Sequence, residues 1–140
     1  MVLNNNYLSL TTQNIHLKQL YPDSHIRRFR EEYLIWTDTI TPSPLGGRYK
    51  VKMVYIKNKC SIEFYVVEPK PLKLAEGKDK LPHVYSHEEQ KLCLFFPDGK
   101  EWTPKLLLSE TIVPWAYEWL FHYELWLGSG IWKGGGKGHH

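Results

Sequence analysis

The fold assignment depends on three neighbouring stretches of the sequence: Leu81-Pro82-His83-Val84-Tyr85-Ser86, Lys91-Leu92-Cys93-Leu94-Phe95 and Trp102-Thr103-Pro104. Together they place a cysteine in a short apolar strand, behind a proline-containing turn and ahead of a Trp-x-Pro corner. A thiol in such a position is either a buried core residue or a nucleophile held at a fixed point on a scaffold. The remaining sequence has to decide between these two interpretations.

Composition limits the class of protein. The chain has 140 residues, of which 42% are hydrophobic and 14% aromatic, which predicts an ordered domain with a substantial core. A net charge of +3 falls short of the clustered basic face of a nucleic-acid binder, so we expect no nucleic-acid partner. We find no run apolar enough to span a bilayer and no signal-peptide pattern, and two cysteines do not make a disulfide framework. These features predict a cytoplasmic protein with reduced thiols and no membrane association.

Three strands are predicted ahead of the cysteine. Residues 33–40 are rich in β-branched and aromatic side chains and end at the proline- and glycine-rich stretch 41–47. Residues 49–55 alternate apolar side chains with lysines, which is typical of a half-buried antiparallel strand. A short polar turn leads into the third strand at 62–67. With the cysteine segment as a fourth strand, the sequence predicts a four-stranded antiparallel β-meander.

Helices are predicted at both ends of the chain. Near the N-terminus, apolar residues at helical spacing predict a short helix that stops before Pro22, namely Ile15, Leu17, Leu20 and Tyr21. From 112 to 127 apolar residues recur at three- and four-residue steps, which predicts a long helix. Ser109 or Thr111 is expected to cap its start, with Pro114 in the first turn and Gly128 at the end.

The predicted fold class is therefore α+β: an N-terminal helix, the four-stranded meander, and the long C-terminal helix packed on the sheet. Residues 1–132 are predicted to form a single domain, and residues 133–140 a flexible glycine-rich tail. The three tryptophans at 115, 119 and 126 cannot all face one side of a helix, so some are expected at the surface as a contact patch for a partner protein.

The order of elements and the motifs resemble the ubiquitin-conjugating enzyme (UBC) family, whose pattern is His-Pro-Asn, then Ile-Cys-Leu, then Trp-x-Pro. The matching positions are Leu81-Pro82-His83, Leu92-Cys93-Leu94 and Trp102-Thr103-Pro104. A closer similarity is to the compact bacterial relatives (type II, short form) encoded in CBASS antiphage operons, through residues 110–115, 118–127 and 131–136. The resemblance implies a UBC-like fold and a bacterial antiviral role.

The resemblance also implies a chemistry, with Cys93 as its nucleophile. Cys93 would accept the C-terminus of a partner protein as a thioester and transfer it to an amine. The implied partners are the nucleotide cyclase (CD-NTase) of the same operon, a separate activating enzyme and a lysine of a target protein. The resemblance implies no cofactor. We also predict no metal, because His122 and Glu124 offer too few ligands and His139 and His140 end the tail.

Each of these roles has an alternative. Cys93 could be an inert core thiol, whereas a carrier requires a sulfur that solvent can reach, and we expect such exposure. His83 replaces the family's Asn and is either a proton donor or acceptor for the reaction or a turn residue that bonds only backbone. His87 is a weaker candidate for that role. Glu88 and Glu89 are expected to be exposed, and Cys60 is expected to be a bystander.

Two functions of different classes follow from the sequence. The first is a cysteine-dependent, ubiquitin-conjugating-like acyltransferase that primes antiviral signalling. The second is a non-catalytic module on the same scaffold that binds and regulates the cyclase. Binding of single-stranded nucleic acid through stacked tryptophans ranks last.

Overall fold

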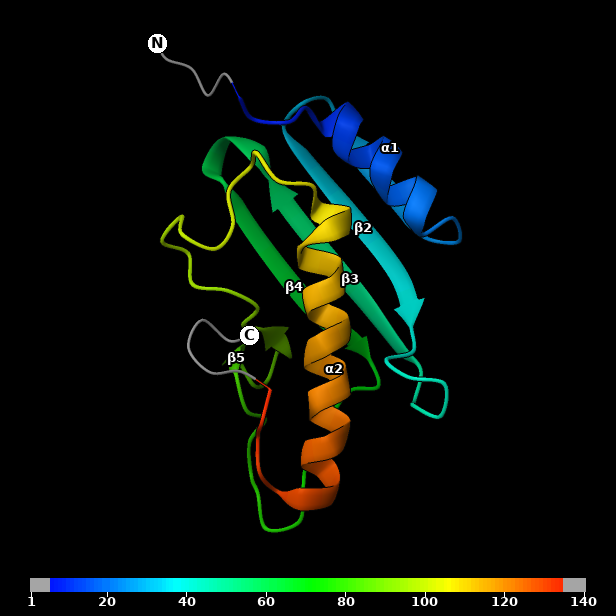
Figure 1. Ribbon diagram of the computed structural model, residues 1–140, viewed down its shortest axis with the longest axis vertical. Helices are drawn as coiled ribbons and strands as arrows, with labels where there is room; N and C mark the ends of the chain where they lie inside the picture. Colours follow the sequence, from blue (N-terminus) through cyan, green and yellow to red (C-terminus); the bar gives the residue numbers. More distant parts are fainter. Residues whose placement is uncertain (1–5, 135–140) are drawn as a thin grey trace.

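The sheet of the computed structural model has six strands in the order β1-β2-β3-β4-β6-β5, each antiparallel to its neighbours (Figure 1). The structure describes residues 6–134. The strands are β1 (His25–Phe29), β2 (Tyr33–Ile40), β3 (Tyr49–Ile56), β4 (Ser61–Glu68), β5 (Val84–Ser86) and β6 (Lys91–Leu92). The α+β class and the three long strands are confirmed, and the prediction of four strands is wrong.

The central strands form where apolar and polar residues alternate along the sequence. Along β3, residues Tyr49, Val51, Met53 and Tyr55 are buried while the residues between them are partly or fully exposed. This period of two matches the pleat of a strand with one face on the core. β2 pairs with β3 in unbroken register from Tyr33↔Ile56 to Ile40↔Tyr49. The predicted turn at 41–47 therefore joins two fully paired strands.

The strands that the sequence analysis missed are short or exposed. Four of the five residues of β1 are exposed and only Ile26 is partly buried, so the strand carries no alternating pattern. The predicted cysteine strand is a two-residue strand, β6, which ends at Leu92. Cys93 therefore follows the strand instead of lying within it. A further short strand, β5, precedes the turn that leads into β6 and pairs with β6.

The N-terminal helix α1 (Leu10–Leu20) is longer than predicted. Ser9 caps it, since its Oγ accepts a hydrogen bond from Thr12 N at 3.0 Å. The buried face is Leu10, Gln13 and Leu17, whereas Ile15 and Leu20 are about half exposed. Gln13 ties the helix to the short 3-10 helix η2 (Leu108–Glu110) by bonds to Leu106 O and Leu108 N. A second 3-10 helix, η1 (Lys57–Lys59), joins β3 to β4.

The long helix α2 (Ile112–Ser129) lies across one face of the sheet (Figure 1). Its buried side joins the core formed by the strands, through Ile112, Val113, Ala116, Trp119, Leu120, Tyr123 and Trp126. The helix ends at Gly130, whose φ of 74° suits glycine and whose N–H donates to Trp126 O at 2.7 Å. Gly128 lies inside the helix, so the predicted end is two residues early. At the start, Thr111 is the N-cap residue, but its hydroxyl donates to Leu107 O instead of capping.

Residues 130–134 turn back along α2 towards β5 (Figure 1). Of the predicted flexible tail, Lys133 and Gly134 are described, and residues 135–140 lie outside the described part of the chain. Among the described helices, α2 included, none combines the length and the apolar character needed to cross a membrane.

Candidate active site

Cys93 is held in place through the backbone of His83. Its amide N–H donates to the His83 carbonyl at 3.2 Å. The same carbonyl accepts a hydrogen bond from Trp119 Nε1 on α2 at 2.9 Å. His83 adopts a left-handed conformation with φ of 47°, which His, like Asn, enters more readily than most residues. A buried indole on the long helix thus fixes the turn that sets the position of the cysteine.

The imidazole of His83 stacks on an aromatic residue that follows α2. Its ring lies 5.1 Å from that of Trp132, with an angle of 23° between the planes. Trp132 also packs on Trp119, with ring centroids 5.5 Å apart. The structure therefore brings the two predicted site residues together through a backbone hydrogen bond and places the His83 ring against the segment after α2.

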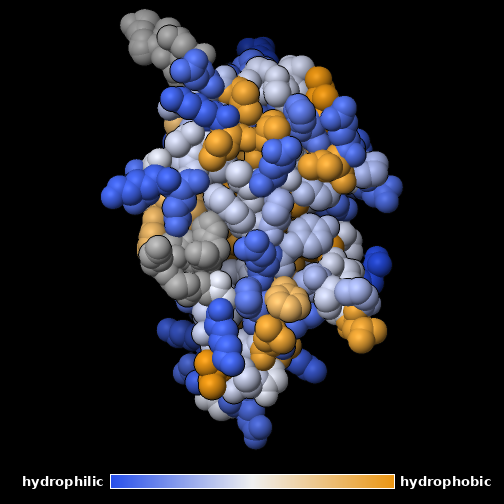
Figure 2. Space-filling view, viewed as in Figure 1, coloured by the Kyte–Doolittle hydropathy of each residue, from blue (hydrophilic) through white to orange (hydrophobic). Residues whose placement is uncertain are grey.

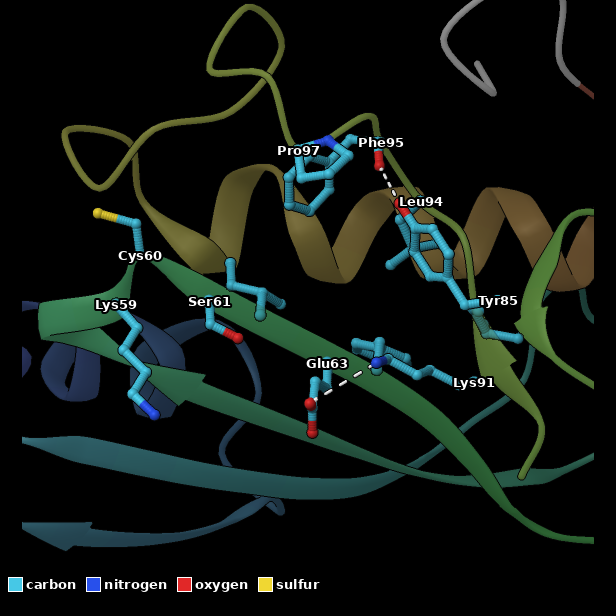
Figure 3. Close-up of a pocket in the computed structure, with 12 residues that line it drawn as sticks. Lys59, Cys60, Ser61, Glu63, Tyr85, Lys91, Leu94, Phe95 and Pro97 are labelled. Carbon is cyan, nitrogen blue, oxygen red and sulfur yellow. Dashed lines mark hydrogen bonds and ion pairs between the residues drawn. The ribbon is translucent and has the colours of Figure 1, made fainter.

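The thiol of Cys93 is buried, and only 6% of the residue is exposed. The expectation of a sulfur open to solvent is therefore wrong for this conformation. The Tyr85 side chain forms a hydrogen bond with the thiol. Its hydroxyl also donates to Phe95 O at 2.8 Å (Figure 3), while 52% of Tyr85 is exposed. An exposed tyrosine, which the sequence analysis did not single out, thus lies beside the buried sulfur.

The pKa of the Cys93 thiol is raised above its ordinary value. The largest cause is burial, which disfavours the charged thiolate. The hydrogen bond from Tyr85 lowers the pKa, and the negative charge of Glu101 raises it. Glu101 is held by a hydrogen bond from Phe96 N at 2.9 Å. The thiol is therefore mainly protonated at neutral pH in this conformation.

The buried side chain of Gln90 stabilises the turn before β6, although its neighbours in the sequence are polar. It is 2% exposed, with φ of 53°. Its side-chain oxygen accepts from Leu72 N at 2.7 Å, and its nitrogen donates to Val66 O and Pro69 O, each at 3.0 Å. One side chain thus joins β4, the turn before β6 and the segment after β4.

The other residues that the sequence analysis considered are not among the groups that shift the pKa of the Cys93 thiol. His87 Nδ1 accepts a hydrogen bond from Leu81 N at 3.1 Å, which stabilises the turn. Glu88 and Glu89 are exposed, as predicted. Cys60 is exposed, with its sulfur 3.8 Å from the Tyr7 hydroxyl.

A groove of about 460 Å³ runs beside the cysteine (Figure 3). One wall is the first half of β4 and the residues before it, 59–64. The opposite wall comes from the cysteine segment and the strand next to it, through Tyr85, Lys91, Leu92, Leu94, Phe95 and Pro97. Lys91 Nζ lies 3.6 Å from a carboxylate oxygen of Glu63 and so spans the groove. The groove thus passes the residues on both sides of Cys93 and the tyrosine that contacts its sulfur.

The exposed surface of α2 differs from the predicted patch of tryptophans. Trp119 and Trp126 are buried, and Trp115 is partly buried. The large apolar side chains exposed on α2 are instead Phe121 and Leu125. On the visible part of this face hydrophobic residues lie in small groups among hydrophilic ones (Figure 2).

Within residues 6–134 no three His, Cys, Asp or Glu side chains converge as a metal site would need. Glu124 has another role, since its Oε2 accepts from Gly47 N at 2.7 Å and from the Tyr49 hydroxyl at 2.6 Å. These bonds fix the loop between β2 and β3 against α2.

Fold and site define a small α+β protein in which a cysteine, placed just past a short strand, is held by a long helix packed on the sheet. Sequence comparison gives the family: the model of the Type II CBASS E2 protein family matches residues 13–140, so the chain belongs to that family. A comparison with curated proteins finds no match. Membership indicates an E2-like role in CBASS, conjugating activity in general, and interaction with other CBASS components.

Proposed function

We propose that this protein is a ubiquitin-conjugating-like transferase that carries the C-terminus of a partner protein as a thioester on Cys93. The partner is the cyclic-oligonucleotide synthase of the same CBASS operon, and the acyl group passes to an amine. This modification primes antiviral signalling. The observation that carries the proposal is the placement of Cys93, at the end of β6, fixed through the His83 carbonyl and beside a groove, in a chain of the E2 family.

The reaction has two steps. In the first, the sulfur attacks a C-terminal carbonyl that a separate activating enzyme has supplied with a leaving group. A C–S bond forms, the leaving group departs and the thiol proton goes to a base. In the second, an amine attacks the thioester, a C–N bond forms and the sulfur leaves and regains a proton. A thioester suits the carrier role because it reacts readily with amines.

Transfer of an acyl group to Cys93 requires the Tyr85 side chain to move. With 6% of Cys93 exposed and its pKa raised, the resting thiol is protected from reagents and is a weak nucleophile. Half of the Tyr85 side chain faces solvent, so its ring can swing outward without leaving a cavity in the core. We infer that an arriving acyl group displaces this tyrosine. The resting protein then exposes no free reactive sulfur at this site.

The His83 imidazole is a candidate positioning or proton-transfer group in this proposal. His83→Asn restores the residue of the ubiquitin-conjugating family and tolerates the left-handed backbone, whereas His83→Ala removes the ring and disfavours that backbone. If the ring transfers a proton, both variants slow aminolysis of a preformed thioester and change its pH profile. If His83 only holds the turn, His83→Asn keeps the wild-type rate.

A non-catalytic module that binds the cyclase is the second candidate. The observation that favours it is the burial of the Cys93 thiol together with its raised pKa, which is also how an inert core cysteine behaves. In this function the fold and surface act without any acyl intermediate.

Co-expression with the neighbouring operon genes, followed by intact-mass spectrometry, separates the two functions. The carrier function predicts an adduct on Cys93 with the mass of a partner protein less one water, released by a thiol. Cys93→Ser is expected to give a thiol-resistant ester or no adduct, and to abolish phage protection. Cys60→Ser is the matched control, because this exposed cysteine is expected to play no part. If Cys93→Ser leaves both adduct and protection unchanged, the carrier function is excluded and the module stands.

A further inference from the structure

We propose that the outer edge of β4 binds the extended C-terminal segment of the acyl donor as an added strand, parallel to β4, with its terminal carboxyl group at Cys93. This inference rests on the proposed function and specifies how the donor is recognised. It assigns to the groove a backbone-directed site that reads an extended chain up to its C-terminal residue.

The first half of β4 has an unpaired edge. Among the described residues β6 pairs with β4 at Tyr65↔Lys91, and the bond from Val66 N to Gln90 O at 3.1 Å belongs to this pairing. Backbone groups alternate between the two sides of a strand, so Ile62 and Phe64 direct theirs to the same side as Val66. Phe64 lies opposite Leu92, the last residue of β6, whereas the groups of Ile62 face the groove beyond the end of β6. An unpaired edge of this kind is a template for another chain.

The groove runs from this edge past the residues that flank Cys93. Its walls are residues 59–64 on one side and the segment around Cys93 on the other, including Leu92 and Leu94. Tyr85 lines the groove and also forms the hydrogen bond with the thiol. A chain in the groove that displaces Tyr85 would therefore meet the sulfur at the point where β6 leaves the sheet.

The position of the sulfur fixes the direction of the bound chain. β4 runs from Ser61, beside Cys60, to Tyr65, beside Lys91. A chain whose C-terminus lies at Cys93 must run the same way, which makes the pairing parallel. At about 3.3 Å per residue, the free edge from Ser61 to Glu63 holds about three residues.

The charges at the Cys93 end suit a carboxyl terminus. The Lys91 ammonium lies 5.8 Å from the centre of the Tyr85 ring and 3.6 Å from Glu63. The terminal carbonyl oxygen of a chain brought to this point would compete with Glu63 for Lys91, next to the tyrosine that contacts the thiol. A chain that ends here, rather than an internal segment, suits this placement.

The test uses the full chain with Cys93→Ala, so that binding is measured without chemistry. The probe is a synthetic peptide with the last eight residues of the operon's nucleotide cyclase. Amide chemical shifts of the protein are followed during titration. We expect the largest changes at Ile62 and Phe64 and no change along β1, the outer strand on the opposite side of the sheet. Methylation of alternate peptide nitrogens in the last four residues should weaken binding about tenfold, and methylation of the intervening nitrogens should have little effect.

Lys91→Ala should weaken binding of the same peptide to Cys93→Ala. Equal effects of methylation at every position, or shifts confined to other surfaces, would overturn the inference. Dimerisation of the free protein through β4 would also overturn it, because a second copy would then occupy the edge. If the full-length donor forms the Cys93 adduct while Ile62 and Phe64 remain unprotected from hydrogen exchange, the groove proposal fails and the carrier function stands. If no adduct forms although the peptide binds as expected, the carrier function fails instead.

Discussion

The side chain of Tyr85 forms a hydrogen bond with the sulfur of Cys93. This contact lowers the pKa of the thiol, whereas burial of the thiol raises it, so the two effects on reactivity oppose each other. The reactivity of Cys93 is therefore set by ionisation and by access, and the two can be measured separately. Such measurements need a Cys60→Ser background, because Cys60 is the exposed thiol.

Tyr85→Phe is expected to move the pH midpoint of Cys93 alkylation upward, because the thiolate loses a hydrogen-bond donor. The rate at the alkaline plateau should rise, because the ring also loses its bond to Phe95 O and uncovers the sulfur more often. Alkylation by iodoacetamide across a pH series gives both values. A midpoint that stays in place or falls would show that the hydroxyl does not stabilise the thiolate.

Glu101→Gln is expected to move the same midpoint downward, because a negative charge that disfavours the thiolate is removed. Glutamine keeps an oxygen for the hydrogen bond from Phe96 N, so the loop should retain its shape. Glu110→Gln is the matched control, since Glu110 is not among the charges that act on Cys93. The same pH series gives the measurement, and an equal shift in the control would assign the effect to net charge.

Trp119→Phe is expected to lower the free energy of unfolding by about 1 kcal/mol more than Trp102→Phe does. Both indoles are buried, but Trp119 Nε1 bonds the His83 carbonyl, whereas Trp102 Nε1 has no partner among the described residues. The comparison thus separates the hydrogen bond from the loss of volume. Urea unfolding of the two variants measures the difference, and equal losses would mean that the bond adds nothing to stability.

Gln90→Leu is expected to cost about 3 kcal/mol or more, because Leu72 N, Val66 O and Pro69 O lose their partner in a buried place. Glu89→Leu, at the exposed neighbouring position, should change stability by less than about 0.5 kcal/mol. Denaturant unfolding monitored by tryptophan fluorescence tests both variants. A small loss for Gln90→Leu would indicate that water replaces the amide.

Periodicity predicted the elements with the strongest amphipathic patterns. The strands at 33–40 and 49–55 and the long helix follow from alternation or helical spacing, because each buries one face. β1 could not be found this way, because it is an edge strand whose side chains are mostly exposed. The strands around Cys93 are two and three residues long, too short for any period to show.

The site was predicted less completely than the fold. The motifs singled out Cys93 and His83, and the structure joins them by a backbone hydrogen bond. Tertiary contacts that residue spacing does not encode determine the rest of the site. They bury the sulfur, bring the charge of Glu101 close to it and supply the hydrogen-bond partners of Gln90. Gln90 in particular follows two exposed glutamates, so its polar neighbours indicated a solvated turn. Sequence and resemblance identified candidate residues, but not what surrounds them.

The stacking of Trp132 on His83 has a practical consequence for handling this protein. An affinity handle or fluorescent label fused after residue 140 would be tethered close to the thiol and could slow loading by simple obstruction. A handle placed ahead of residue 6 would instead leave from the α1 side of the molecule (Figure 1). Assays of thioester formation should therefore use N-terminal fusions, and a comparison of the two ends would show how much room the reaction needs.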